Sequence, residues 1–154
     1  MKISSLLDKQ TILLNLKVDT KETLIKRMVA ALDGKVENTL LPVIEEAVLE
    51  REQVMSTGVG KRLAIPHAKL QQLDQNLAVF ARLDDPLEYG SIDNQPVELV
   101  VLLIGSQDKA SIHIKLLSRV SRLMNNDLLR NQLFDAKNED QILEIFLEEE
   151  NGSV

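Results

Sequence analysis

The sequence predicts a single-domain α/β sandwich, in which a mixed sheet of four to five strands is flanked by helices on both faces. Segments with strand-like spacing of apolar residues alternate along the chain with segments of helical spacing. Residues 97–104 are almost continuously apolar, as expected of a central strand that is covered on both faces. The length of 154 residues is close to the usual size of one domain.

The first strand is expected over residues 12–18, where every second residue is a large apolar one. This period of two favours an edge or near-edge strand that is buried mainly on one face. Asp19 and Glu22 then form a capping-box-like helix start. Apolar residues follow at helical spacing, and Gly34 stands where a left-handed cap would end this helix.

A second helix is expected to begin near Asn38, to accommodate Pro42 in its first turn and to run to about Glu52. Residues 51–70 lose the helical periodicity and contain turn-forming residues. A short apolar segment, residues 63–65, interrupts them and predicts a short strand.

Two further strands are expected over residues 77–83 and 97–104. Residues 84–96, which join them, form a connection short enough for antiparallel pairing. Asp108 is expected to cap the next helix. The apolar stripe of that helix comprises Ile112, Leu116, Val120 and Leu123.

Two shorter helices complete the predicted fold, one capped near Asn126 or Asp127 and one capped at Asn138. The domain is expected to span residues 1–150, and residues 151–154 are expected to form a disordered tail at the end of an acidic stretch.

Composition and charge exclude several classes of function. The chain has 18 basic and 24 acidic residues, a net charge of −6 and only four aromatic residues, which argues against nucleic-acid binding. The absence of cysteine excludes thiolate zinc sites, iron–sulfur clusters and cysteine nucleophiles. The longest apolar run, residues 99–104, is far shorter than a membrane span, and the start of the chain lacks a signal-peptide pattern. We therefore expect a cytoplasmic protein.

Residues 51–69 concentrate one histidine, two glycines, two hydroxyl side chains and several basic residues. Gly60 and Lys61 suggest a P-loop, but that motif requires glycine where Met55 stands and serine or threonine where Arg62 stands. A P-loop is therefore rejected.

His67 suggests a different kind of phosphate chemistry. A neutral imidazole is a good nucleophile near pH 7, and Pro66 before it stiffens the backbone. Arg51 could stabilise the charge of a phosphohistidine, and Thr57 or the amides around Gly58 could donate hydrogen bonds to it. A lone histidine after proline is also compatible with a purely structural role, and this alternative stays open on the residues alone.

The second histidine, His113, is compatible with either a structural or a functional role. His113 is expected in the first turn of its helix, half-buried against the sheet, where core packing explains it almost as well as catalysis does. A metal site that uses both histidines is a weaker hypothesis, because neither has a suitably spaced helical partner.

Three blocks of sequence nevertheless resemble a known family. They are Arg51-Glu52 with Ser56-Thr57-Gly58-Val59-Gly60 and Ala64-Ile65-Pro66-His67; Ile92-Asp93-Asn94-Gln95-Pro96-Val97-Glu98-Leu99-Val100; and His113-Ile114-Lys115-Leu116-Leu117. Together they resemble the fructose/mannitol-type (type-2) enzyme IIA family of the bacterial phosphoenolpyruvate-dependent phosphotransferase system. The opening Ile3-Ser4-Ser5-Leu6-Leu7 is most similar to the free-standing nitrogen-regulatory branch.

The resemblance implies a phosphotransferase that accepts a phosphoryl group on His67 from a histidine-containing phosphocarrier protein, HPr or its nitrogen-branch homologue. It further implies that His113 is the second active-site histidine and that Arg51 lines the same pocket. Ser56, Thr57 and Gly58 are the expected phosphate-binding residues. No metal or cofactor is implied, and the expected role is nitrogen or metabolic regulation through regulated target proteins.

The chain departs from the family pattern at Lys61, Arg62 and Ala68, where members usually carry small or uncharged residues. Lys61 and Arg62 are expected to add positive charge beside His67 and thereby to affect partner choice.

Two alternative functions remain at this stage. One is a sugar-specific IIA component that passes its phosphoryl group to a IIB permease domain in fructose/mannitol-type uptake. The other is a non-catalytic regulatory interaction module, which would not need His67, His113 and Arg51 together.

Overall fold

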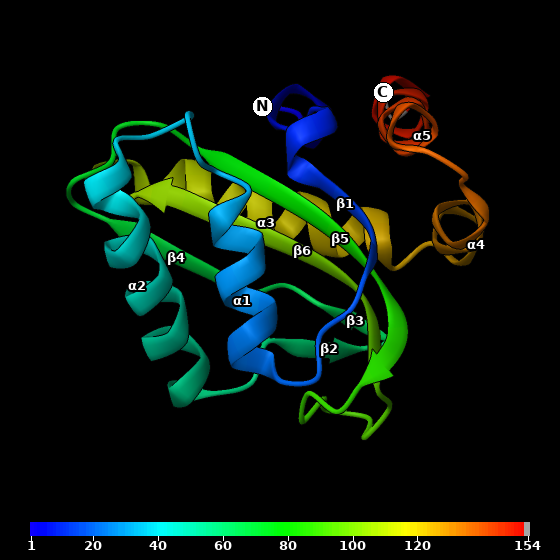
Figure 1. Cartoon of the computed structure of the whole chain (residues 1–154). Helices are drawn as coiled ribbons and strands as arrows, with labels where there is room; N and C mark the ends of the chain where they lie inside the picture. Colours follow the sequence, from blue (N-terminus) through cyan, green and yellow to red (C-terminus); the bar gives the residue numbers. More distant parts are fainter. Residues whose placement is uncertain (153–154) are drawn as a thin grey trace.

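The computed structural model describes residues 1–152 as a mixed sheet between two layers of helices (Figure 1). The strands of the described chain are β1 (Ile12–Leu16), β2 (Gly58–Gly60), β3 (Leu63–Ala64), β4 (His67–Leu70), β5 (Leu77–Leu87) and β6 (Val97–Ser106). The α-helices are α1 (Lys21–Ala30), α2 (Leu41–Val54), α3 (Ala110–Met124), α4 (Asp127–Asp135) and α5 (Glu139–Gly152). Residues 1–152 also form four short 3-10 helices: η1 (Ile3–Leu6), η2 (Lys9–Thr11), η3 (Asn38–Leu40) and η4 (Gln107–Lys109).

The sheet is centred on β5 and β6. Its order is β1-β5-β6-β3-β2, and β4 pairs with β6 beyond the end of β3. β5 and β6 are antiparallel, whereas β1 is parallel to β5 and both β3 and β4 are parallel to β6. This confirms the predicted mixed sheet, the edge position of the first strand and the antiparallel pair.

The described chain forms six strands, where four to five were expected and four were located in the sequence. The additional ones are β2 and β4, which lie in the segment that the sequence presents as turn-rich. Both are very short, and β2 consists of glycine, valine and glycine, so neither shows a strand period.

Alternate residues of β6 point into two separate cores, which explains why this strand is apolar throughout. Val100, Leu102 and Ile104 pack with α1 and α2, whereas Leu99, Val101 and Leu103 pack with α3, α4 and α5. Figure 1 shows these two helical layers on opposite faces of the sheet. The predicted sandwich is therefore confirmed.

Two helix starts differ from the expectation. The side chain of Thr20, and not that of Asp19, caps α1 by accepting a hydrogen bond of 3.0 Å from the Thr23 amide. Asp108 lies within η4, and Lys109 precedes α3 without any side-chain cap. Because Asp108 is part of this 3-10 helix, it does not occupy the N-cap position of α3, and the expected cap is not formed.

The start of α2 and the caps of the last two helices agree with the expectation. η3 leads into α2, which has Pro42 in its first turn. The side chain of Asn126 accepts from the Leu129 amide, and that of Asn138 accepts from the Gln141 amide.

The C-terminal helix is longer than expected. Asn151 and Gly152, which were assigned to a tail, are the last residues of α5, and residues 153–154 lie outside the described part of the chain. The carboxylate of Glu150 accepts hydrogen bonds of 2.8 Å from the amides of Ile3 and Ser4, which fastens α5 to η1. Within residues 1–152, no helix has the length and apolar character needed to cross a membrane.

Candidate active site

His67 is the first residue of β4, directly after Pro66. Its Nδ1 lies 2.8 Å from the carbonyl oxygen of Ile65. Because a carbonyl can only accept, Nδ1 carries the proton of the neutral ring and Nε2 carries the lone pair. The side chain is half-buried, so the ring is fixed on one edge while it stays accessible to a reactant.

His113 extends from α3 toward this ring. The two ring centres are 5.8 Å apart, and the ring planes are tilted by 49°. His113 is only 2% exposed, so it is fully buried and not half-buried as predicted. Gly105 of β6 makes room for it, because a Cβ at that position would lie 2.5 Å from His113 Nδ1.

Burial keeps both imidazoles neutral near pH 7. The pKa of His67 is lowered mainly by loss of solvent; Arg51 and Lys69 lower it further, while the Ile65 carbonyl and Glu52 act in the opposite direction. The pKa of His113 falls to about 4, again mainly through burial, with smaller contributions from His67 and Lys69. The ring of His67 is therefore uncharged at physiological pH and has one nitrogen with a free lone pair.

Arg51 lies in the last turn of α2, and its Nη1 donates a hydrogen bond of 2.9 Å to the Met55 carbonyl. A cavity of about 620 Å³ joins Arg51 and His67 to the segment from Ser56 to Gly58. The structure thus places these predicted site residues around one cavity, with His113 against the ring of His67.

The polar groups of Ser56, Thr57 and Gly58 already have partners within the chain. Ser56 Oγ donates to the Tyr89 carbonyl at 3.2 Å and accepts from the Gly58 amide at 3.2 Å. Thr57 Oγ1 donates to Glu52 and lies 3.1 Å from the hydroxyl of Tyr89. Phosphate binding by these three residues remains a prediction, and it requires some of these hydrogen bonds to be exchanged.

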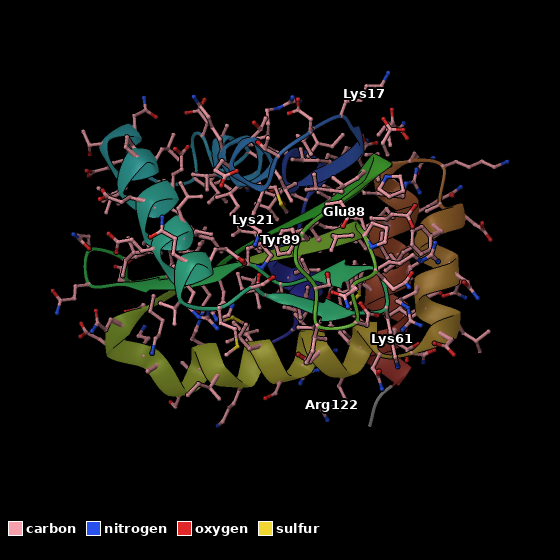
Figure 2. The ribbon with its side chains drawn as sticks, turned by 90° about the horizontal axis from the view of Figure 1, so that it is seen from below. Lys17, Lys21, Lys61, Glu88, Tyr89 and Arg122 are labelled. Atoms are coloured by element: carbon pink, nitrogen blue, oxygen red, sulfur yellow. The ribbon has the colours of Figure 1, made fainter. Side chains whose placement is uncertain are left out.

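Glu52 and Tyr89 form a buried network behind the cavity that the sequence did not reveal. The Glu52 carboxylate accepts from the Thr57 amide, from the Tyr89 hydroxyl at 2.7 Å and from Lys21 Nζ at 3.1 Å. Lys21 Nζ also lies 4.1 Å from the centre of the Tyr89 ring (Figure 2). Burial and the adjacent Glu52 charge raise the pKa of Tyr89, so its hydroxyl stays protonated as a donor. The spacing of Ile44, Val48 and Glu52 along one helix face was the available signal, because it places Glu52 on the buried side of α2.

Lys61 and Arg62 do not add the expected charge beside His67. Both adopt positive φ angles, 56° and 64°, in the tight turn between β2 and β3. Arg62 is directed to Glu98, with 2.8 Å between Nη1 and Oε2, and to the face of the Phe134 ring. Its charge is therefore compensated away from the site.

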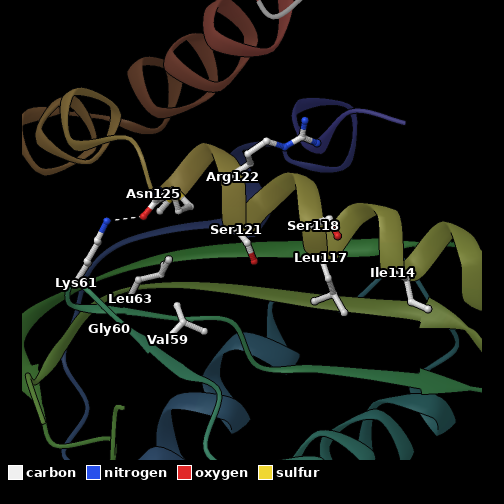
Figure 3. A pocket seen from close by; sticks show the side chains of 11 residues that line it. Val59, Gly60, Lys61, Leu63, Ile114, Leu117, Ser118, Ser121, Arg122 and Asn125 are labelled. Carbon is white, nitrogen blue, oxygen red and sulfur yellow. Dashed lines mark hydrogen bonds between the residues drawn. The ribbon is translucent and has the colours of Figure 1, made fainter. Parts of the chain in front are cut away.

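Lys61 reaches across a second cavity of about 620 Å³ and donates a hydrogen bond to the Asn125 side chain at the end of α3 (Figure 3). The cations that influence the pKa of His67 are instead Arg51 and Lys69. Lys69 shares a face of β4 with His67, since alternate residues of a strand point the same way.

The fold and this site together define a class of protein: an α/β sandwich that presents a neutral histidine, backed by a second histidine, in a cavity lined by arginine. The family model described as "Phosphoenolpyruvate-dependent sugar phosphotransferase system, EIIA 2" matches residues 5–149. The chain therefore belongs to this family of phosphoryl carriers.

Individual relatives come from two branches of the family. The chain is 40% identical over 147 residues to the "PTS system fructose-specific EIIABC component" of Bacillus subtilis; the match covers 94% of this chain but only 23% of that protein. It is 36% identical over 136 residues to the "Nitrogen regulatory protein" of Bradyrhizobium diazoefficiens, with 86% of each chain covered.

A solved structure supports the fold independently. The crystal structure of nitrogen regulatory protein IIA-Ntr from Neisseria meningitidis superimposes with a TM-score of 0.88, covering 94% of this chain and 98% of that chain at 24% identity. At this identity the likeness concerns the fold.

Proposed function

We propose that this chain accepts a phosphoryl group on Nε2 of His67 from a histidine phosphocarrier protein, HPr or its nitrogen-branch homologue, and acts in nitrogen or metabolic regulation. The observation that supports this most directly is the hydrogen bond between His67 Nδ1 and the Ile65 carbonyl. It leaves Nε2 as the nitrogen with the lone pair.

The transfer step follows from this tautomer. The lone pair of Nε2 attacks the phosphorus atom, the N–P bond on the donor imidazole breaks, and the donor nitrogen keeps the bonding electron pair. His67 retains its Nδ1 proton throughout, so no base is needed. Phosphoryl transfer passes through a loose transition state, and the protein therefore has mainly to align the reactants and to stabilise charge on the equatorial oxygens.

Arg51 and His113 have complementary roles in this proposal. Arg51 is a permanent cation that lines the cavity and can turn from the Met55 carbonyl to the phosphoryl oxygens. His113 is next to the receiving ring and can donate a hydrogen bond to the phosphoryl group. The predicted phosphate contacts of Ser56, Thr57 and Gly58 would line the other side of the same cavity.

The surroundings of the cavity are suited to a protein donor. Three side chains from different elements, Met55, Val59 and Ile92, line the cavity and are 69%, 49% and 83% exposed; we call them the apolar collar. Exposed apolar side chains grouped around a site are typical of surfaces that bind proteins. The donor is thus expected to cover the collar while its phosphohistidine enters the cavity.

A sugar-specific role is the second candidate. In that case the chain would act as the IIA component of a fructose/mannitol-type uptake system and pass the phosphoryl group to a IIB domain. The identity of 40% to the fructose-specific EIIABC component favours it, whereas the identity of 36% to the nitrogen regulatory protein favours the regulatory role.

The test is phosphoryl labelling from radioactive phosphoenolpyruvate with enzyme I and two phosphocarriers compared side by side, HPr and its nitrogen-branch homologue. The native chain is expected to gain a label that is lost in acid and kept in alkali, and His67→Ala is expected to abolish it. A label that survives His67→Ala would exclude His67 as the acceptor.

A second arm separates the two candidate roles. The labelled chain is incubated with membranes that contain a fructose-type IIB permease and with the sugar. Retention of the label is the result expected of the regulatory role, whereas formation of sugar phosphate supports the uptake role. His113→Ala serves as a comparison variant, because it leaves the acceptor in place and is expected to slow labelling without abolishing it.

A further inference from the structure

His113 poses a problem of hydrogen bonding that the proposed role does not solve. Both of its ring nitrogens are buried and have no hydrogen-bond partner within residues 1–152. Such groups are uncommon in folded proteins, because each one loses its bonds to water without replacement. A neutral imidazole has one N–H donor and one acceptor nitrogen, so one acceptor and one donor should be found near this ring.

Asn76 provides an acceptor at the right place. Its Oδ1 is also buried and without a partner in the described chain. Measured from the position that a Cβ on Gly105 would take, His113 Nδ1 lies at 2.5 Å and Asn76 Oδ1 at 3.2 Å. Because Gly105 has no side chain, a small space remains there, and both His113 Nδ1 and Asn76 Oδ1 lie next to it.

The register of the sheet explains how these residues meet. Leu77, the first residue of β5, pairs with Ile104, so Asn76 stands beside Gly105. On the other side of β6, Lys69 of β4 pairs with Gly105. Asn76 and Gly105 are therefore neighbours across the end of the sheet, and the helix-borne ring of His113 covers them.

We propose that Asn76 is a positioning residue whose Oδ1 accepts the Nδ1–H of His113 and thereby fixes the tautomer of that ring. The two atoms do not form a direct hydrogen bond in this arrangement; a change in the side-chain torsion of Asn76 or a bridging water connects them. The other amide group of Asn76 is held only weakly, by a contact of 3.7 Å between Nδ2 and Met1 Sδ. Such a contact restrains the amide little.

Fixing the proton on Nδ1 determines what His113 Nε2 can do. In the free protein Nε2 carries a lone pair. When a phosphoryl dianion is bound next to it, uptake of one proton from solvent makes His113 an imidazolium, which donates from Nδ1 to Asn76 and from Nε2 to a phosphoryl oxygen. This extension rests on the proposed phosphorylation of His67, whereas the tautomer itself does not. The titratable groups that act on the pKa of His113 are His67 and Lys69, both from β4.

The experiment is nitrogen-15 NMR of the two histidine rings in the unphosphorylated native chain, in Asn76→Leu and Asn76→Asp, and in the control Gln75→Leu. Gln75 is the exposed neighbour of Asn76 and bonds to the Lys35 carbonyl, remote from the rings. The native chain and the control are expected to show His113 protonated on Nδ1. Asn76→Leu is expected to lose this preference, and Asn76→Asp is expected to keep it and to raise the pKa of His113 by about one unit.

An unchanged His113 tautomer in Asn76→Leu, or an unchanged His113 pKa in Asn76→Asp, would overturn the assignment. If Asn76→Leu does not fold, the pKa of His113 in Asn76→Asp still tests the proposal. Phosphoryl uptake is measured in parallel: Asn76→Leu is expected to slow labelling about tenfold while the label stays on His67. If His67 is not labelled even in the native chain, the proposed function fails, while the tautomer result still decides the role of Asn76.

Discussion

At the scale of single residues, the chemistry of the site depends on which ring nitrogens are occupied. The Ile65 carbonyl holds the Nδ1 proton of His67, and burial keeps the ring neutral. His67, His113 and Arg51 were predicted as site residues through the blocks that resemble the enzyme IIA family, because the residues alone left a structural role for the histidines open. Nothing in the sequence indicated the partners of their side chains, since those come from elements distant in the chain.

Glu52 illustrates this limit, and its removal has a predictable cost. Glu52→Ala leaves the Tyr89 hydroxyl, the Thr57 amide and the ammonium group of Lys21 without their shared acceptor. We expect the free energy of unfolding to fall by about 3–5 kcal/mol in urea denaturation. Glu50→Ala, two residues away on the exposed face of the same helix, is the matched control and should change the free energy of unfolding by less than about 0.5 kcal/mol. Equal losses in both variants would mean that the buried network contributes nothing specific.

His113 is expected to make stability depend on pH. Its folded pKa of about 4 lies below the unfolded value of about 6.5, so the unfolded chain binds more protons between these values. The stabilisation is present above pH 6.5 and is lost as the pH falls toward 4. Between pH 7 and pH 4.5 the native chain should lose about 2 kcal/mol more than His113→Asn, measured by urea denaturation at each pH. Parallel pH profiles of the two proteins would contradict this expectation.

At the scale of elements, the position of β6 explains most of the architecture. Its apolar run identified a central strand, and the periodicity of the flanking segments identified the long helices. The short strands β2 and β4 could not be predicted, because three or four residues carry no usable period and their pairing depends on the neighbouring strands β3 and β6. Helix starts were uncertain for a similar reason, since Asp19 and Thr20 are both good caps and only the path of the chain selects Thr20.

Gly105 connects β6 to the site, and its replacement tests that connection. In Gly105→Ala the new Cβ would lie 2.5 Å from His113 Nδ1, so the ring or the strand must shift. We expect a loss of about 1–3 kcal/mol in unfolding free energy, together with slower phosphoryl uptake.

Gly152→Ala is the control for Gly105→Ala, because a Cβ at that position meets no atom within 4 Å. If Gly105→Ala and Gly152→Ala had the same rate of phosphoryl uptake and the same unfolding free energy, His113 would not be packed in a fixed position against β6.

At the scale of the whole molecule, a chain with a net charge of −6 exposes apolar side chains around one cavity. The sequence could not show this grouping, because the apolar collar draws on the end of α2, on β2 and on the connection between β5 and β6. The sequence also could not show that Arg62 forms an ion pair with Glu98. The direction of the Arg62 side chain depends on the turn in which Lys61 and Arg62 both have positive φ angles.

The collar predicts a separation between docking and chemistry. Ile92→Asp introduces a charge at a side chain that is 83% exposed, so folding should be unaffected. We expect the KM for the phosphorylated carrier to rise about tenfold, while kcat changes little, because the site's own residues remain in place. Leu128→Asp, at a similarly exposed leucine on α4, is the control and should leave both constants unchanged. Identical kinetics for the two variants would remove the collar from the docking surface.

The most direct measurement is the location of the phosphoryl group by phosphorus-31 and nitrogen-15 NMR after incubation with phosphoenolpyruvate, enzyme I and a phosphocarrier. We predict a single phosphoramidate on Nε2 of His67, with the proton to the Ile65 carbonyl retained on Nδ1. Attachment to Nδ1 of His67, attachment to His113 or no modification of either ring would contradict the account.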